Sequence, residues 1–564
     1  MLGRLSRRDG MVACLLLATL LIFATAGQRP ITATPPSQLE IALPLQSPSG
    51  IDLGARKRVA DLEAAAQGRF ILGVETSPVD LGYPIRWGSR DLPPSTLYGL
   101  HSLDPAWQLR NLYLETGDRR ALDLAIEIAL DYRERNPLMF PEHSYAWGEH
   151  PAATRAVIFL YLGQLAHEIG DPRQAVLWRA SLECAAFVSR RSQWVIGHNH
   201  GLFIGAALIT VGTAMNRDEL VRLGRSRFFG TWDRIVADGF LLEHNPSYQM
   251  AIAELAARLA LVDADFETGF DWRDRADALR NQMKFLASPG GELPMFGDQK
   301  GDRRYSLPGS PERGEFWFPR AGYLGWRGLA TGLVVDLAAH SHVHSRNTVS
   351  SIAIYDRGDE LGAYRTHAAY RWLCTGMDAV PEVSVVLEPG VPGMRRVRIG
   401  LRYAAAVDIQ RIMTVTRGKI ELRDRLNVPE YGDCRMAVDR AAVVEGGRLI
   451  EGAVVPEGSE IVTTLSLAGD PLSSTTAAAD LERFEQVRVQ PFDERWDALR
   501  KLGHRIRRPG KPPAAFAALL GGAFVSWMLS IRTASQRGFS RLFHAGALAL
   551  GTIGLAIALL GAFL

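Results

Sequence analysis

The stretch Leu122–Asp131, with the sequence LDLAIEIALD, shows the pattern that organises the first half of the chain. Its apolar residues recur at the three- and four-residue spacing of one helix face, whereas Asp123, Glu127 and Asp131 share the opposite face. Similar periodicity runs from about residue 55 to residue 310. These residues predict a domain of amphipathic helices.

Two Gly-Asp pairs, Gly117-Asp118 and Gly170-Asp171, each lie between two helical patterns. Their spacing of 53 residues suggests a repeated helical hairpin. Antiparallel helix pairs that curve into an incomplete (α/α) toroid would bury the apolar stripes. The groove of such a toroid would be lined by helix ends.

After about residue 315 the pattern changes to short runs rich in β-branched residues, separated by turns such as Arg417-Gly418-Lys419. Many short strands without intervening helices predict an antiparallel β-sandwich. The predicted fold class is therefore a multidomain α+β protein, with the toroid first and the sandwich second. The predicted strands are Val349–Tyr355, Val383–Leu387, Val397–Tyr403, Ile409–Val415, Ile420–Leu426 and Ile461–Leu467.

Both ends of the chain carry patterns typical of membrane contact. Three arginines precede an uncharged run from Met11 to Gly27, in which Ala24-Thr25-Ala26 fits a cleavage site for an export signal. Ala514–Ile531 and Ala545–Leu564 contain no charged residue, and each is about long enough to cross a bilayer as a helix. Arginines between these two runs favour a cytoplasmic link and an exported main domain, although a second basic cluster precedes the first run.

The predicted organisation follows from these patterns. It comprises a signal peptide or anchor at 1–27, a linker at 28–54, the toroid at 55–314, the β-sandwich at 315–495, a basic linker at 496–512 and two transmembrane helices at 513–564.

Composition bears on one class of function and on one class of fold. The 64 basic and 61 acidic residues give a formal charge of +3, so nothing favours nucleic-acid binding. Four cysteines, one of them in the leader, rule out a disulfide scaffold.

Two short segments carry polar side chains able to transfer protons: Gly197–His200 (GHNH) and Glu243–Tyr248 (EHNPSY). Each lies at the start of a long apolar run. Asn245 is predicted to be an N-cap and Pro246 the first helical residue, which places Tyr248 in the first turn. Helix N-termini carry free N–H groups and a partial positive charge, so they suit an anionic ligand.

The motifs of the chain, in their order, resemble those of the heparinase II/III-like polysaccharide lyases over roughly residues 55–490. The resemblance implies a toroid followed by a sandwich that cuts uronic-acid-containing polysaccharides by β-elimination. The matching motifs are Asn199-His200, Glu243–Tyr248, Phe296-Gly297-Asp298, Phe318–Tyr323 leading into Trp326-Arg327, and the histidine-rich His340–Ser345.

The resemblance assigns Asn199 to neutralise the substrate carboxylate, and Tyr248 and His200 to act as the acid–base pair. The proton next to an ionised carboxylate is very weakly acidic, and an amide bonded to that carboxylate lets the developing enolate charge be shared. A base must then remove the proton, and an acid must protonate the departing glycosidic oxygen. A phenol has a high pKa, so Tyr248 would need a cationic or hydrogen-bonding neighbour to act as the base.

Structural roles stay open for the same residues. Asn199 could cap a helix, His200 could be a satisfied semi-buried histidine, and Tyr248 could pack with its hydroxyl bonded to backbone. Glu243 could be a structural carboxylate and Asp298 a turn former.

The residues assigned to substrate binding are His198, Glu243, His244 and Arg346.

The histidine-rich stretch departs from the family's pattern. The family commonly shows His-x-His-x-Asp or His-Ser-His-Asn-Asp, and in either register this chain lacks the aspartate that would help hold a metal. His340, His342 and His344 would lie on one face of a strand, so a zinc or calcium ion at His342 and His344 stays an alternative. His344 is otherwise expected to be catalytic, and Arg346 could pair with a substrate carboxylate.

Three functions remain in view. The preferred one is a membrane-anchored lyase, exported to the periplasmic or extracytoplasmic face and held by its C-terminal helices, that acts on an anionic polysaccharide. A glycoside hydrolase on the same toroid would use Glu243 and Asp298 as its two carboxylates. A non-catalytic polysaccharide-binding or export factor is the third, because Arg346 or Thr348 replaces the family's residues.

Overall fold

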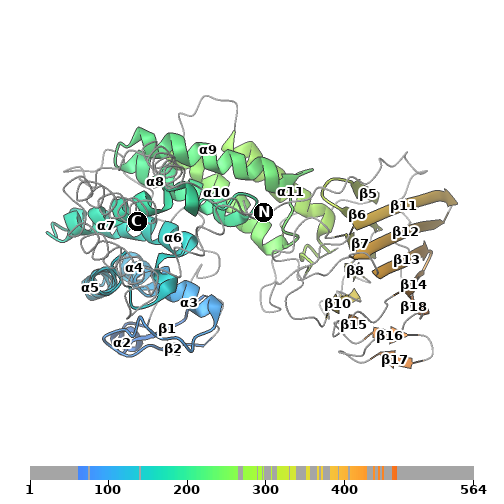
Figure 1. Ribbon diagram of the computed structural model, residues 1–564, viewed down its shortest axis with the longest axis horizontal. Coiled ribbons are helices and arrows are strands. Elements are labelled where there is room, and N and C mark those ends of the chain that lie inside the picture. Colours follow the sequence, from blue (N-terminus) through green and yellow to red (C-terminus); the bar gives the residue numbers. More distant parts are fainter. Residues whose placement is uncertain are drawn as a thin grey trace, which may run out of the picture.

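The structure is a computed structural model of the full chain, in which helices occupy one end of the molecule and strands the other (Figure 1). The described residues are 61–73, 77–138, 141–263, 271–288, 290–294, 296, 307, 314–328, 331–337, 351–355, 365–367, 370–372, 382–391, 393–403, 407–427, 436–438, 442–444, 447–449 and 460–466.

Helices dominate the part that precedes residue 290. They are α2 (Leu62–Ala66), α3 (Pro94–His101), α4 (Asp104–Thr116), α5 (Arg119–Arg135), η1 (Ser144–Trp147), α6 (Glu149–Glu168), α7 (Gln174–Val188), η2 (Arg191–Gln193), α8 (Asn199–Ala214), α9 (Asp218–Ile235), α10 (Pro246–Val262) and α11 (Trp272–Leu286).

The helices pair in sequence order, α4 with α5, α6 with α7, α8 with α9 and α10 with α11. Three of these hairpins turn at a residue with left-handed backbone: Gly117 (φ 73°), Gly170 (φ 71°) and Asn216 (φ 51°). Glycine and asparagine adopt this conformation most readily, so they end a helix well. The two predicted Gly-Asp turns are therefore confirmed, and Asn216 forms a third.

Burial separates inner helices from outer ones. Nearly every residue of α6 and α8 is buried, whereas α5, α9 and α11 each keep a polar face.

Helices α8 and α9 approach each other closely at Gly205. A Cβ on this residue would lie 2.8 Å from the Phe228 Cβ and 2.9 Å from the Gly224 carbonyl oxygen. Only glycine permits this approach.

Two short hairpins correct the prediction of helices alone in this region: β1 (Arg69–Phe70) with β2 (Val79–Asp80), and β3 (Val236–Ala237) with β4 (Phe240–Leu241). The β3–β4 turn is Asp238-Gly239, and both residues have positive φ, 51° and 77°. A two-residue hairpin turn of type I′ requires this backbone and favours Asp-Gly. The Asp-Gly pair is the signal that the helical periodicity obscured.

Two five-stranded antiparallel sheets follow, in the orders β5-β6-β7-β8-β9 and β11-β12-β13-β14-β18. Each of the six predicted strands coincides with an observed strand. The strands are β5 (Gly314–Phe318), β6 (Tyr323–Arg327), β7 (Gly332–Asp336), β8 (Ser351–Tyr355), β9 (Arg365–His367), β10 (Tyr370–Trp372), β11 (Glu382–Val391), β12 (Met394–Tyr403), β13 (Val407–Thr416), β14 (Lys419–Asn427), β15 (Met436–Val438), β16 (Ala442–Val444), β17 (Gly447–Leu449) and β18 (Glu460–Ser466).

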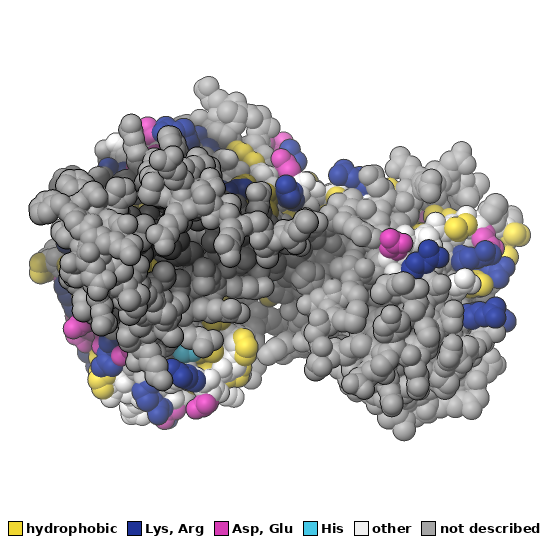
Figure 2. Space-filling model, viewed as in Figure 1, with side chains coloured by type: hydrophobic (Ala, Val, Ile, Leu, Met, Phe, Trp, Pro, Cys, Tyr) yellow, Lys and Arg dark blue, Asp and Glu magenta, His cyan; other side chains and the backbone are white. Residues whose placement is uncertain are grey.

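Alternation along the strands places one face of the second sheet in the core. On β12, Val397 and Ile399 are fully buried while Arg398 is exposed. On the face shown in Figure 2, basic and acidic side chains lie near one another at this end of the molecule. Ion pairs such as Arg398–Glu388 (2.8 Å) belong to this sheet, and Arg395–Glu315 (3.1 Å) connects it to β5 of the first sheet.

The motif Phe318–Tyr323 with Trp326-Arg327 joins the sheets to the helices. Asp238 of the β3–β4 turn accepts hydrogen bonds from the backbone N–H groups of Arg320 (2.9 Å) and Ala321 (3.0 Å). The Arg327 guanidinium donates to the carbonyl oxygens of Lys284 (2.9 Å) and Phe285 (2.8 Å) at the C-terminal end of α11. Free carbonyls at a helix C-terminus favour such a cation.

Several predictions lie outside the described residues. These include the leader at 1–27, the linkers, the two C-terminal apolar runs and the histidine-rich stretch. Within the described ranges, every helix is too short or too polar to cross a bilayer. The boundaries of the domains and the curvature of the helical part into a toroid stay predictions.

Candidate active site

Asn199 and Glu243 bring the two predicted segments together. The Asn199 backbone N–H donates to Glu243 Oε1 (2.7 Å), and the Asn199 side-chain amide donates to Glu243 Oε2 (2.8 Å). Each residue is about 1% exposed. The carboxylate therefore holds the backbone of Asn199 through one oxygen and its side-chain amide through the other.

The start of α8 explains why the Asn199 side chain is available for this contact. His198 is the N-cap, and its Nδ1 accepts a hydrogen bond from the backbone N–H of His200 (3.1 Å). Asn199 is the first helical residue, so the capping role considered for it falls to His198. Because Nδ1 of His198 accepts, the proton of its neutral ring lies on Nε2.

The start of α10 confirms the prediction for the second segment. Asn245 is the N-cap, and its Oδ1 accepts from the backbone N–H groups of Ser247 (3.0 Å) and Tyr248 (3.3 Å). Pro246 opens the helix, and Tyr248 lies in its first turn, partly buried against the core. The cap fixes the backbone from which the Tyr248 phenol projects.

His244 occupies a strained position between the helices and the sheets. Its backbone is left-handed (φ 53°), and its side chain is fully buried. Its Nδ1 lies 2.5 Å from Oδ1 of Asp336, the last residue of β7, and its ring is 5.1 Å from the Tyr323 ring. A residue with a Cβ keeps this conformation only where its surroundings impose it. The sequence analysis assigned His244 to substrate binding. In the structure its side chain connects the loop before α10 to the first sheet through Asp336.

A third group at the site, Glu149-His150 at the start of α6, was missed in the sequence. Glu149 Oε1 lies 3.1 Å from His200 Nδ1, and the His150 and His200 ring centroids are 4.2 Å apart. Behind them the Tyr98 hydroxyl lies 3.2 Å from His150 Nε2. The available signal was a polar pair opening an apolar helix, as Asn199-His200 does 50 residues later.

Helix N-termini and the carboxylates of Glu149 and Glu243 come together at this end. The N-terminal ends of α6 and α8 and the residues just before α10 meet here, and each helix N-terminus carries a partial positive charge. Burial raises the pKa of the Tyr98 phenol. Burial and the nearby Glu149 raise the pKa of Tyr145, which is 37% exposed. Both phenols therefore stay protonated.

Exposure differs sharply among these side chains. The His200 side chain is 30% exposed and that of Glu149 is 12% exposed, whereas His198 as a residue is 6% exposed. Asn199 and Glu243 lie beneath them. A ligand that approaches from solvent meets His200 before it meets Asn199.

The remaining predicted site residues lie outside the described part of the chain. They are Asp298, His340, His342, His344, Arg346 and Thr348. Among the residues that the structure does describe, three or more His, Cys, Asp or Glu side chains are nowhere grouped so as to hold a metal ion. The predicted zinc or calcium site therefore stays a prediction.

Comparison with known proteins gives distant structural likenesses. No family model matches the sequence, and no curated protein matches it. A heparan sulfate lyase, HepC from Pedobacter heparinus, is similar with a TM-score of 0.42 and 13% identity over 83% of this chain and 89% of that one. A structure of heparinase III is similar with a TM-score of 0.42 and 14% identity over 81% of this chain and 88% of that one.

Chondroitin AC lyase from Streptomyces coelicolor A3, solved with chondroitin sulphate, is similar with a TM-score of 0.27 and 10% identity. The match covers 80% of this chain and 82% of that chain. Likenesses at this level assign no activity to the present protein.

Proposed function

We propose that this protein is a polysaccharide lyase that cleaves uronic-acid-containing chains by β-elimination. The observation that carries the proposal is the double hydrogen bond between Asn199 and Glu243. It joins the two segments that hold the proposed neutralising amide and the proposed acid–base pair. The motif resemblance supports the same assignment.

The reaction needs a carboxylate-binding group, a base and an acid. An amide nitrogen carries two hydrogens, so Asn199 keeps one N–H for the substrate carboxylate after it donates the other to Glu243. The base takes the proton from the carbon next to the carboxylate, and that electron pair forms the new carbon–carbon double bond. The bond to the glycosidic oxygen breaks, and the acid protonates this oxygen. His200 and Tyr248 are the proposed pair.

Glu243 fits a positioning role better than a role in hydrolysis. A hydrolase would require its carboxylate to face the glycosidic bond or the attacking water. In the structure both Glu243 oxygens accept hydrogen bonds from Asn199, and the residue is about 1% exposed. We therefore assign Glu243 to orienting Asn199.

A non-catalytic polysaccharide-binding factor is the second candidate, because one observation favours it. Asn199 is about 1% exposed, so a substrate carboxylate reaches its amide only if covering atoms move. A protein that only binds the polymer needs no such movement. Binding without bond cleavage would identify this alternative.

The proposal includes export and attachment to a membrane through the apolar C-terminal runs. Their lack of charge and the basic leader of the sequence support it. Fractionation of expressing cells tests this part independently: recovery of the full-length chain in the soluble fraction without detergent would contradict it.

The central experiment incubates the full-length protein with a panel of acidic polysaccharides, heparan sulfate and chondroitin sulfate among them. Elimination produces a conjugated double bond that absorbs in the near ultraviolet, whereas hydrolysis produces none. Tyr248→Phe removes one hydroxyl and is expected to lower turnover by at least about 10²-fold with little change in binding. Tyr113→Phe, which removes a hydroxyl from α4, is the matched control and should retain full turnover. Unchanged turnover in Tyr248→Phe would remove Tyr248 from the mechanism.

A further inference from the structure

The contact between Glu149 and His200 determines how the imidazole is presented to a ligand. Glu149 Oε1 lies 3.1 Å from His200 Nδ1, and the two residues come from the first turns of α6 and α8. An ionised carboxylate can only accept hydrogen bonds, so Nδ1 must be the protonated nitrogen of His200. In the neutral ring the other nitrogen, Nε2, carries a lone pair.

Neighbouring rings hold this imidazole in place. The His198 ring centroid is 4.0 Å away from that of His200, and the His150 centroid is 4.2 Å away. His150 is fixed in turn by the Tyr98 hydroxyl (3.2 Å) and by stacking on Phe203, at 4.7 Å between centroids. Rotation of His200 away from Glu149 would disturb this packing.

We infer that Glu149 is a positioning residue that keeps the His200 proton on Nδ1 and leaves Nε2 free to accept a proton. The inference rests on the proposed function and makes His200 the base of the pair. In the step itself, Nε2 takes the proton from the carbon next to the substrate carboxylate, and the other proton stays on Nδ1, hydrogen-bonded to Glu149. Tyr248 then protonates the departing oxygen, and a proton from His200 through solvent restores the phenol.

His198 provides an internal contrast. Its Nδ1 accepts from the His200 backbone, so its neutral ring carries the proton on Nε2. Adjacent imidazoles are therefore expected to hold opposite tautomers, each set by a different partner. Glu149 sets one of them at 3.1 Å, and the His200 backbone N–H sets the other at 3.1 Å, with Glu243 Oε1 farther from His198 Nδ1 at 3.6 Å.

Nuclear magnetic resonance of the full-length protein, labelled with ¹⁵N in its histidine rings, reads the tautomers directly. Spectra are recorded at about pH 8, where unperturbed histidine is neutral. Comparison with His200→Gln assigns the His200 signals. The expected pattern is a proton on Nδ1 in the unaltered chain and a loss of that preference in Glu149→Leu, because leucine removes the acceptor for the Nδ1 proton, whereas glutamine would keep an amide oxygen there.

Kinetics form the second arm. Glu149→Gln should lower kcat about 10²-fold with KM changed less than about threefold, and Glu149→Asp should recover part of the loss. The matched control is Glu183→Gln on α7, a half-buried carboxylate that pairs with Arg133 (2.8 Å). It should leave both the His200 tautomer and kcat unchanged.

The resonance measurement tests the role of Glu149, and the kinetics test the proposed lyase activity, so each claim can fail without the other. A proton on Nε2 of His200 in the unaltered chain, or a tautomer unaffected by Glu149→Leu, overturns the inference whatever the turnover. If the tautomer responds as expected while no polysaccharide is cleaved, the positioning by Glu149 stands and the lyase activity does not.

Discussion

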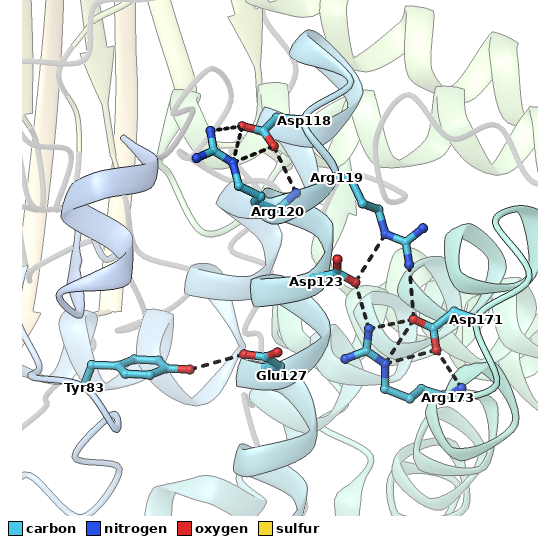
Figure 3. A network of polar contacts seen from close by, with 8 residues as sticks. All are labelled: Tyr83, Asp118, Arg119, Arg120, Asp123, Glu127, Asp171 and Arg173. Carbon is cyan, nitrogen blue, oxygen red and sulfur yellow. Dashed lines mark hydrogen bonds and ion pairs between the residues drawn. The ribbon is translucent and has the colours of Figure 1, made fainter.

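The helical hairpins use carboxylates differently at their two ends. At the turn end, Asp118 and Asp171 each bind the arginine two residues later, Arg120 at 2.7 Å and Arg173 at 2.6 Å (Figure 3). Asp123 links the two turns by accepting from Arg173 (2.9 Å). At the opposite end, Glu149 and Glu243 contact an imidazole and an amide.

The difference shows which charges serve stability and which serve the candidate site. Arginine satisfies a carboxylate and holds it in its charged form, so the pKa values of Asp118 and Asp171 are lowered chiefly by hydrogen bonds from Arg120 and Arg173. A carboxylate that accepts from a neutral donor, such as an imidazole or an amide, instead fixes the orientation of that donor, and the donor can then act on a ligand. Substitutions at the two ends should therefore affect different properties.

The largest effect is expected for Glu243→Gln. Both Asn199 donors point at the carboxylate, and glutamine offers one acceptor and one donor in its place, so one Asn199 N–H would lose its acceptor. We expect kcat to fall about 10²–10³-fold and the free energy of unfolding to fall by about 1–3 kcal/mol. The fall in kcat is measured as turnover on the polysaccharide that is cleaved fastest, and the fall in unfolding free energy is measured by denaturant unfolding. Glu254→Gln on the surface of α10 is the control, and a kcat within twofold of the unaltered protein for Glu243→Gln would contradict the positioning role.

The next effect, on the free energy of unfolding, is expected for Asp336→Asn. The Asp336–His244 pair is fully buried and connects β7 to the loop before α10. Weakening such a pair should cost about 3 kcal/mol of unfolding free energy. The denaturant midpoint measures this cost. The comparison variant is Asp277→Asn, which weakens the exposed Asp277–Arg280 ion pair on α11. Equal midpoints for the two variants would show that the buried Asp336–His244 pair does not stabilise the contact between β7 and the loop before α10.

The smallest effects belong to the turns. Asp171→Asn should lower the free energy of unfolding by about 1–2 kcal/mol without changing turnover. Because folding lowers the pKa of Asp171, this contribution is complete above the ordinary aspartate pKa of about 4 and disappears as pH falls through the lowered value. Unfolding midpoints between about pH 3 and pH 7 test the sign. Asp118→Asn, in the more exposed turn, should shift the midpoint less, and a larger shift there would invalidate the comparison.

Local patterns were sufficient for much of the fold. Alternation along the chain predicted β11 to β14 because each strand buries one face, and Asn245-Pro246 predicted the start of α10 because a cap depends on a few adjacent residues. The hairpin at Asp238-Gly239 carried an equally local signal, which the surrounding helical periodicity outweighed. The order of helices before sheets followed from the change of period near residue 315.

The contacts that build the candidate site were less accessible to sequence reasoning. Glu149 meets His200 across 51 residues, and His244 meets Asp336 across 92. Neither pairing has a local signature, since each depends on how separate hairpins or domains pack. Asn199 and Glu243 were both selected from their motifs, but the bond between them follows only from the packing of α8 against the residues before α10.

The backbone of His244 has a consequence for the order in which the molecule is completed. Its left-handed conformation is disfavoured for a residue with a Cβ, and the carboxylate that holds its ring belongs to β7. A growing chain makes its helices first and reaches β7 some ninety residues after this loop. We therefore expect the loop that carries Glu243 and leads into α10 to acquire its final shape late, once the first sheet has docked, so that the newly made helices alone lack the finished candidate site.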